Sequence, residues 1–175
     1  MPGCTIDSSA SPEFQQLVKS WQKTHPQIDN DLQDAFSAIS QNILAKKGRR
    51  VQAGPNLEVY KYRQNSHDIK RGSSYGWRIY ALYDKSTGTM YPILIYPKTV
   101  WEDADNTTVH DAIRSIRIRL GYCMQSECNG KMTMFIPQEI YRGNDGDQVK
   151  LQCRNCRTVS WMEYNLATAF IQELV

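Results

Sequence analysis

Two pairs of cysteines in the last third of the chain constrain its fold more than any other feature. Cys123 and Cys128 lie in the segment "GYCMQSECNGKM", and Cys153 and Cys156 follow in "LQCRNCRTVSW". Two turns that each present two thiolates can supply the four soft donors that Zn²⁺ binds at the corners of a tetrahedron. The C-x-x-C spacing is the commonest at such sites, and C-x4-C lies within their range. The four cysteines therefore predict one bound zinc ion.

Two other interpretations of these cysteines are a redox-active C-x-x-C and four unliganded buried thiols. The redox interpretation requires a C-x-x-C that opens a helix in a βαβ unit, and the surrounding pattern does not predict one. If protein ligands fill all four positions, no position is left for a water molecule, so the zinc ion is expected to be structural. A segment of about 40 residues hardly buries its own core, and the ion would supply the missing folding energy.

The remaining cysteine, Cys4, stands alone near a start, "MPGCTIDSSASPEF", that lacks the basic and apolar runs of a secretory signal. No window approaches the roughly 18 continuous apolar residues of a membrane span. We therefore expect a cytoplasmic protein with reduced thiols and no membrane partner. A length of 175 residues with 41% apolar content suits one compact domain with an appended segment, or two small domains. The expected parts are residues 1–120 and 121–175.

Hydrophobic periodicity predicts an α+β fold for the first part. A short strand covers residues 4–7, and two helices follow, the first with Ser11 as its N-cap and the second after Pro26. Their apolar stripes predict a helical hairpin packed on a small antiparallel sheet with strands at 57–63, 76–84 and 89–97. A third helix is expected over 105–120, capped by Asn106 or Thr107.

The second part is expected to be a four-cysteine zinc-binding β-hairpin module. Short strands are predicted within 132–141 and at 148–153, so that the hairpin separates the two cysteine pairs. A closing C-terminal helix is predicted over 160–175. Its apolar side would carry Met162, Leu166, Phe170 and Leu174.

The period of two along the predicted strands separates two faces of the sheet. If the helical hairpin covers the face that carries the tyrosines and tryptophan, four cations remain together on the open face. These are Lys61, Arg63, Arg78 and Lys98. The net charge is only +3, but basic residues cluster in "AKKGRR", "YKYRQNSHDIKRG" and "RSIRIRL". Grouped cations repel one another unless an anion lies among them, so RNA or DNA phosphate is the expected ligand. Lys47 is expected to lie outside this cluster.

Three segments of these strands, "YKYR", "SYGWRIY" and "YPKTVW", resemble motifs of the RelE/ParE superfamily of bacterial toxins. The closer similarity is to the RelE-type, ribosome-dependent mRNA interferases. The resemblance covers about residues 4–120 and does not extend to the cysteine pairs. It implies cleavage of mRNA by attack of a 2′-hydroxyl on the next phosphate, and it implies the ribosome and a cognate antitoxin as partners.

The resemblance also implies roles for individual residues. Lys61 and Arg63 would activate the 2′-hydroxyl and contact phosphate, Arg78 would stabilise the pentacoordinate phosphate, and Lys98 would assist the leaving group. Trp101 would stack on a base, with Tyr96 as the second candidate for that role. The residues expected to contact RNA are Lys70, Arg71, Tyr80, Tyr96 and Trp101.

Several alternatives stay open at the level of sequence. A non-catalytic nucleic-acid-binding adaptor could use the same cations, and a ParE-like inhibitor of a topoisomerase would not need them. His67 is either a loop residue without a role or a general base beside Lys61. Asp103 and Asp105 are expected to precede or cap the third helix rather than to bind a metal.

Overall fold

The computed structural model describes residues 3–53, 56–69, 75–101, 103–123, 128, 132–134, 140–143, 146–153 and 155–163. The described chain is an α+β protein that divides into two compact units, Met1–Ile116 and Arg117–Val175. The division falls inside the third helix, before the boundary expected at Gly121. Within the described residues, no helix combines the length and the apolar composition that a membrane span requires.

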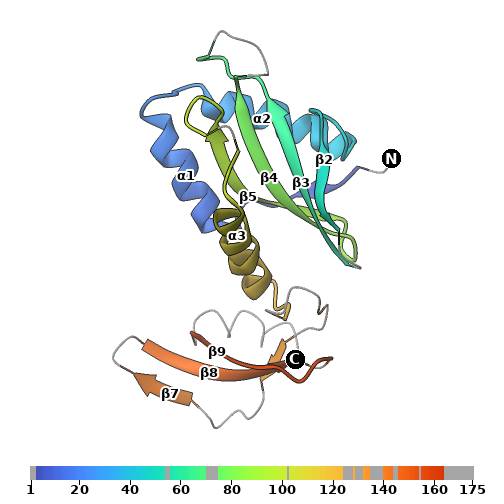
Figure 1. The fold of residues 1–175 in the computed structure, drawn as a ribbon, viewed down its shortest axis with the longest axis vertical. Coiled ribbons are helices and arrows are strands. Elements are labelled where there is room, and N and C mark those ends of the chain that lie inside the picture. Colours follow the sequence, from blue (N-terminus) through green and yellow to red (C-terminus); the bar gives the residue numbers. More distant parts are fainter. Residues whose placement is uncertain are drawn as a thin grey trace. The chain divides into compact units, whose positions relative to one another are not determined.

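The first unit contains a five-stranded mixed sheet in the order β1-β5-β4-β3-β2 (Figure 1). Its strands are β1 (Thr5–Ile6), β2 (Arg49–Ala53), β3 (Leu57–Gln64), β4 (Trp77–Asp84) and β5 (Thr89–Pro97). β1 pairs with β5 in parallel, and the other neighbours are antiparallel. The three predicted central strands are confirmed, whereas β2 was not predicted. β2 forms the edge beside β3 and carries mainly exposed residues, so it lacks the alternating pattern of a half-buried strand.

Two helices, α1 (Pro12–Gln22) and α2 (Ile28–Gln41), lie on one face of this sheet (Figure 1). Both helices bury their apolar stripes against aromatic and aliphatic side chains that every second strand residue contributes. Trp77, Tyr62 and Ile79 are almost completely buried in this core. The predicted packing of a helical hairpin on the sheet is therefore confirmed, and Lys61 and Arg78 belong to the opposite face.

The third helix, α3 (Asn106–Arg119), begins after Asp105, which supplies its cap. Asp105 accepts hydrogen bonds from the backbone N–H and from the hydroxyl of Thr108, each at 2.8 Å. A side-chain oxygen that satisfies an N–H of the first turn is the defining contact of an N-cap. The cap is therefore Asp105, one of the two aspartates expected to precede or cap this helix, and the prediction of Asn106 or Thr107 as the cap is wrong.

The second unit contains four antiparallel strands that pair around β8. They are β6 (Met132–Met134), β7 (Ile140–Gly143), β8 (Gly146–Cys153) and β9 (Val159–Glu163). The strand predicted at 148–153 is confirmed as part of β8. The segment 132–141, predicted as one strand, instead contains β6 and the beginning of β7, which both pair with β8. A helix beginning at Ser160 is wrong, because the β-branched and aromatic residues there pair with β8 as β9. The rest of that predicted helix, including Leu166, Phe170 and Leu174, lies outside the described residues.

Candidate functional site

The register of the sheet places cations opposite cations on two pairs of neighbouring strands. Arg63 of β3 lies directly opposite Arg78 of β4. Arg49 of β2 lies directly opposite Lys61 of β3. Like charges at directly opposite positions of an antiparallel pair destabilise a sheet. One such pair joins β2 to β3 and the other joins β3 to β4. Their presence indicates that this surface has a role other than stabilising the fold.

These side chains line a cavity of about 440 Å³, which we call the basic cavity. Its lining residues are Lys47, Arg49, Lys61, Arg63, Arg78, Lys98 and Asp103. The structure thus brings together all four cations that strand periodicity predicted to share a face. It also adds Lys47, so the expectation that this residue lies outside the cluster is wrong. Arg49 and Asp103 had no predicted role at this site.

A strained loop before β2 explains how Lys47 reaches the cavity. Lys46 and Lys47 both adopt φ of 54°, a left-handed conformation that non-glycine residues rarely adopt. The carbonyl of Lys46 accepts a hydrogen bond from the backbone N–H of Arg63 at 2.9 Å, which ties the loop to β3. Gly48 then passes so close to the core that a Cβ there would lie 2.7 Å from Cε1 of Tyr62. Sequence periodicity carries no signal for such a loop.

Among the described residues that line the basic cavity, Asp103 is the one carboxylate. It accepts hydrogen bonds from Lys61 and from the hydroxyls of Tyr80, at 2.8 Å, and Tyr96, at 3.2 Å. Partial burial opposes ionisation, but the hydrogen bonds from Lys61 and Tyr80 outweigh it and hold the pKa of Asp103 below its ordinary value. An ionised carboxylate is therefore fixed beside a lysine and two phenols.

Tyr80 and Tyr96 belong to the hydrogen-bond network of Asp103 and are not placed to stack on a bound base. The backbone N–H of Ala104 donates to the Tyr96 hydroxyl at 2.8 Å, and the Tyr96 side chain is completely buried. Tyr80 is 5% exposed, and burial together with the Asp103 hydrogen bond raises its pKa. Neither ring has a free face for stacking, so the burial does not fit the predicted base-contact role of Tyr80 and Tyr96. Trp101 is 46% exposed and lies edge-on to Tyr96 at 5.5 Å, so it keeps an accessible ring.

Arg78 is the most buried cation of the cavity, at 3% exposure. Burial first, and the adjacent Arg63 second, lower the pKa of its guanidinium. Arginine keeps its charge under such conditions because its ordinary pKa lies far above neutral pH. A buried cation beside a second cation is a preorganised receptor for negative charge.

His67 does not line the basic cavity. Its ring Nδ1 lies 2.5 Å from Oδ1 of Asp31, a fully buried residue of α2, and its backbone N–H donates to the same carboxylate at 3.0 Å. Trp77 also donates to Asp31, at 2.7 Å. This network belongs to the helix-covered side of the sheet, so the structure does not support His67 as a base beside Lys61. Lys70 and Arg71 lie outside the described residues.

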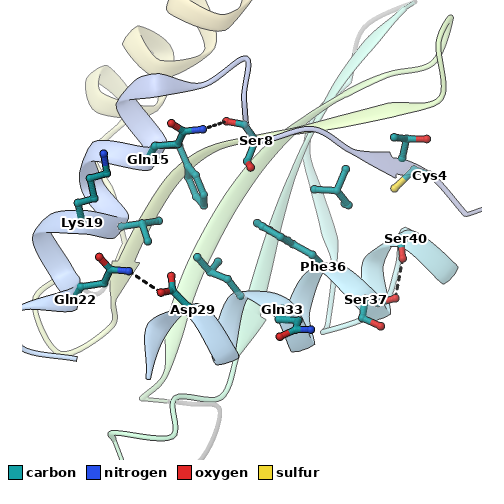
Figure 2. A pocket seen from close by; sticks show the side chains of 15 residues that line it. Cys4, Ser8, Gln15, Lys19, Gln22, Asp29, Gln33, Phe36, Ser37 and Ser40 are labelled. Atoms are coloured by element: carbon teal, nitrogen blue, oxygen red, sulfur yellow. Dashed lines mark hydrogen bonds between the residues drawn. The ribbon is translucent and has the colours of Figure 1, made fainter. Parts of the chain in front are cut away.

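A larger groove of about 770 Å³ opens between α1, α2 and β1 (Figure 2). Phe14, Val18 and Phe36 contribute apolar surface to it. The charged residues among those that line it are Lys19 and Asp29, and Asp29 accepts a hydrogen bond from Gln22 at 2.7 Å. The described residues that line the groove include no cluster of cations and no groups that could act together as acid and base. The basic cavity is therefore the better candidate for chemistry.

The second unit gathers the sulfur atoms of all four predicted cysteine ligands. The Sγ atoms of Cys123, Cys128, Cys153 and Cys156 lie within 4.8 Å of one another, and none of the four is in a disulfide. The pairs Cys123–Cys156 and Cys128–Cys153 are separated by 3.6 and 3.5 Å. These four sulfur atoms can hold a metal ion.

Backbone hydrogen bonds hold the turn that carries the second cysteine pair. The N–H of Cys153 donates to the carbonyl of Thr158 at 2.9 Å, and the N–H of Arg157 donates to the carbonyl of Cys153 at 3.1 Å. Arg157 adopts φ of 63°, so a left-handed residue closes this turn. Thr158 also lies 3.1 Å from the Cys156 sulfur, and its hydrogen bonds lower the pKa of Cys156 to about 6.

A buried arginine organises the turn that carries the first pair. The Arg117 guanidinium donates to the carbonyl of Cys123 at 2.9 Å and to the carbonyl of Cys128 at 2.7 Å. Arg117 is 5% exposed. A single side chain therefore fixes both ends of the C-x4-C segment and adds a positive charge beside the thiols.

Comparison of the chain with family models, curated proteins and solved structures gives no match. The function is therefore inferred from the two sites themselves. The resemblance to RelE-type toxins rests on three short segments and stays a prediction.

Proposed function

We propose that the chain is an endoribonuclease of the RelE type that cleaves mRNA through attack of a 2′-hydroxyl on the adjacent phosphate. The observation that carries the proposal is the basic cavity, in which two like-charged cross-strand pairs converge. A phosphodiester bound there would relieve the repulsion between Arg63 and Arg78, and RNA supplies both the phosphate and the 2′-hydroxyl that attacks it.

The residues of the cavity can divide the chemistry among them. Asp103, held ionised by Lys61, accepts the proton of the 2′-hydroxyl as O2′ forms its bond to phosphorus. Arg63 and Arg78 stabilise the charge that develops on the non-bridging oxygens. Lys98 donates a proton to the leaving 5′-oxygen as its bond to phosphorus breaks. The products are a 2′,3′-cyclic phosphate and a free 5′-hydroxyl, so no water is consumed.

The metal at the four cysteines is proposed to be zinc, in a structural role. A tetrahedron with Zn–S bonds of about 2.3 Å has sulfur atoms about 3.8 Å apart. The separations of 3.5 and 3.6 Å within the described cluster fit this arrangement. Four protein ligands fill the coordination sphere, and the bound ion would stabilise the fold of the second unit. This unit is proposed to dock RNA, the ribosome or an antitoxin.

The test is cleavage of a defined mRNA by the purified full chain, with and without translating ribosomes. New 5′-hydroxyl ends and 2′,3′-cyclic phosphates are expected in the presence of ribosomes, and an Arg78→Ala variant should produce almost none. Growth arrest on expression, relieved by a co-expressed neighbouring reading frame, would support the toxin role and identify the antitoxin. A protein that binds RNA yet never cuts it, with or without ribosomes, would overturn the proposal.

The second candidate is a non-catalytic nucleic-acid-binding adaptor. One observation favours it: Lys61 is already paired with Asp103, so the carboxylate that would act as base is engaged with a cation. The adaptor predicts phosphate affinity distributed evenly over the cavity cations and no cleavage products. A ParE-like topoisomerase inhibitor has less support, because that role gives no reason for the paired cations.

A further inference from the structure

A second cavity, of about 250 Å³, adjoins the basic cavity, because Arg49 and Asp103 line both. We propose that it is a nucleobase subsite, which receives the base of a nucleotide whose phosphate lies in the basic cavity. This inference rests on the proposed function for the class of its ligand. It also assigns to Gln52 and Asn106 the discrimination between RNA sequences, through contacts with the base.

The size and lining of the second cavity suit one planar base. Its volume is smaller than the roughly 300–1,000 Å³ of pockets for drug-sized ligands. Val51, Val59 and Val109 supply aliphatic surface for the faces of a ring. Gln52 and Asn106 supply carboxamides, which each carry donors and an acceptor that can pair with the edge of a base.

A β-bulge explains why Gln52 belongs to this cavity. Along β2, Arg49 is opposite Lys61 and Arg50 is opposite Tyr60, but the register then shifts so that Gln52 is opposite Val59. Without the extra residue, the Gln52 side chain would lie on the same face of the sheet as that of Arg50, because side chains alternate along a strand. With the bulge, it shares the open face with Arg49. Bulges commonly redirect a side chain beside a functional site, and this one directs an amide next to a phosphate-binding cation.

The opposite wall comes from the first turns of α3. Asn106, Val109 and His110 are spaced by three and four residues, so they share one side of the helix. The Asp105 cap fixes where this helix begins and hence where Asn106 stands. Asp103 and Ala104, just before the cap, complete the lining between the two cavities. The catalytic carboxylate of the proposed mechanism thus lies between the phosphate cavity and the base cavity, where the ribose of a bound nucleotide would be.

The experiment measures binding of the four nucleoside 3′-monophosphates, ribose 5-phosphate and inorganic phosphate to the full chain by calorimetry. At least one nucleotide should bind about tenfold more tightly than inorganic phosphate, because a well-placed amide pair to a base contributes on the order of a tenfold preference. Gln52→Ala and Asn106→Ala should remove this preference and leave phosphate affinity unchanged. Gln16→Ala, which removes an exposed amide of α1, is the matched control and should change neither.

Four outcomes would decide between the subsite and the proposed cleavage. Equal affinity for all four nucleotides and for inorganic phosphate overturns the subsite, as does a base preference that survives both amide substitutions. Base-dependent binding by a protein that never cuts RNA keeps the subsite and overturns the proposed cleavage. RNA cleavage whose cut positions are identical in the wild type and in both amide variants keeps the cleavage and overturns the subsite. Gln52 and Asn106 are partly or fully exposed, so both variants should fold, and thermal unfolding of each checks this.

Discussion

Arg63 and Arg78 lie directly opposite each other on β3 and β4, and Arg78 is almost completely buried. Opposed guanidinium groups repel each other, and burial strengthens the repulsion because less water screens it. A sheet that keeps such a pair gains stability whenever an anion lies between the two groups. We therefore expect the stability of the fold to depend on the anions in solution.

The first prediction is that phosphate raises the unfolding temperature of the wild type. A ligand that binds only the folded state adds about 2.7 kcal/mol at a concentration one hundred times its dissociation constant. Arg78→Ala should show a much smaller increase, because one of the two opposed cations is lost. Lys23→Ala, an exposed cation at the end of α1, is the control and should respond as the wild type does. An equal response of all three proteins would count against an anion site.

The second prediction separates catalysis from binding at Arg78. If its guanidinium stabilises charge that develops during the reaction, Arg78→Ala should lower the cleavage rate by about 10²–10³. Affinity for RNA should fall only modestly, because one phosphate contact among many is lost, and the salt dependence of binding should become flatter. Lys23→Ala again serves as the control, since Lys47 lines the cavity and cannot. Loss of affinity that matches the loss of rate would favour the adaptor instead.

How much of this site could be predicted depended on whether its residues lie in regular strands. Lys61, Arg63 and Arg78 could be grouped because side chains alternate along a strand, and antiparallel neighbours keep that alternation in phase. β4 begins at Trp77, one residue after the predicted start at Gly76, so the predicted strand already had the correct alternation for this pairing. The prediction needed no knowledge of the loops.

The residues that were missed reach the cavity by other means. Lys47 depends on two successive left-handed residues, and Arg49 lies on an exposed edge strand without an alternating pattern. Asp103 lies in the segment between β5 and α3, and its position depends on contacts with β3, β4 and β5. Such contacts join residues distant in sequence, so local patterns do not predict them. The same holds for β9, whose pairing with β8 prevails over a helical apolar stripe.

The third prediction concerns the pH dependence of stability through Asp103. Its pKa is lower in the folded chain than the ordinary 3.8, so its contribution is complete above that value and is lost as the pH falls through the folded pKa. Asp103→Asn should therefore be less stable than the wild type at neutral pH. The difference in unfolding free energy should stay constant down to about pH 5 and shrink below pH 4. Chemical unfolding across pH 3–7 measures it, and a difference that grows in acid would contradict the assignment.

The fourth prediction tests the buried carboxylate of Asp31 as a structural group. Asp31→Ala leaves the Trp77 ring N–H and the His67 backbone N–H without their acceptor, at a cost of about 2–4 kcal/mol in unfolding free energy. Asp34→Ala, an exposed carboxylate on the same helix, should change stability by less than about 0.5 kcal/mol. His67→Ala should leave cleavage of mRNA largely intact. A loss of cleavage rate as large as that of Arg78→Ala would instead show that His67 takes part in catalysis.

The fifth prediction is one zinc ion per chain, bound by the four-cysteine cluster. Elemental analysis of freshly purified protein should find about one equivalent, and cobalt substitution should give the absorption bands of a tetrahedral tetrathiolate site. Cys153→Ser should hold less than half an equivalent, because the buried sulfur it removes cannot be replaced by a water molecule without opening the cluster. Cys4→Ser is the matched control, since Cys4 lies in the first unit and its thiol donates to the carbonyl of Ile39.

Removal of the ion should affect the two units differently. A chelator should abolish the unfolding transition of the second unit, whose folding would depend on the metal, and leave that of the first unit in place. Arg117→Met should weaken metal affinity without removing a ligand, because the carbonyls of Cys123 and Cys128 lose the donor that fixes their turn. Competition with a chromophoric chelator measures that affinity. A chelator that unfolds the whole chain in one step would show that the first unit, too, depends on the cluster, and unchanged zinc content in Cys153→Ser would exclude the cluster as the site.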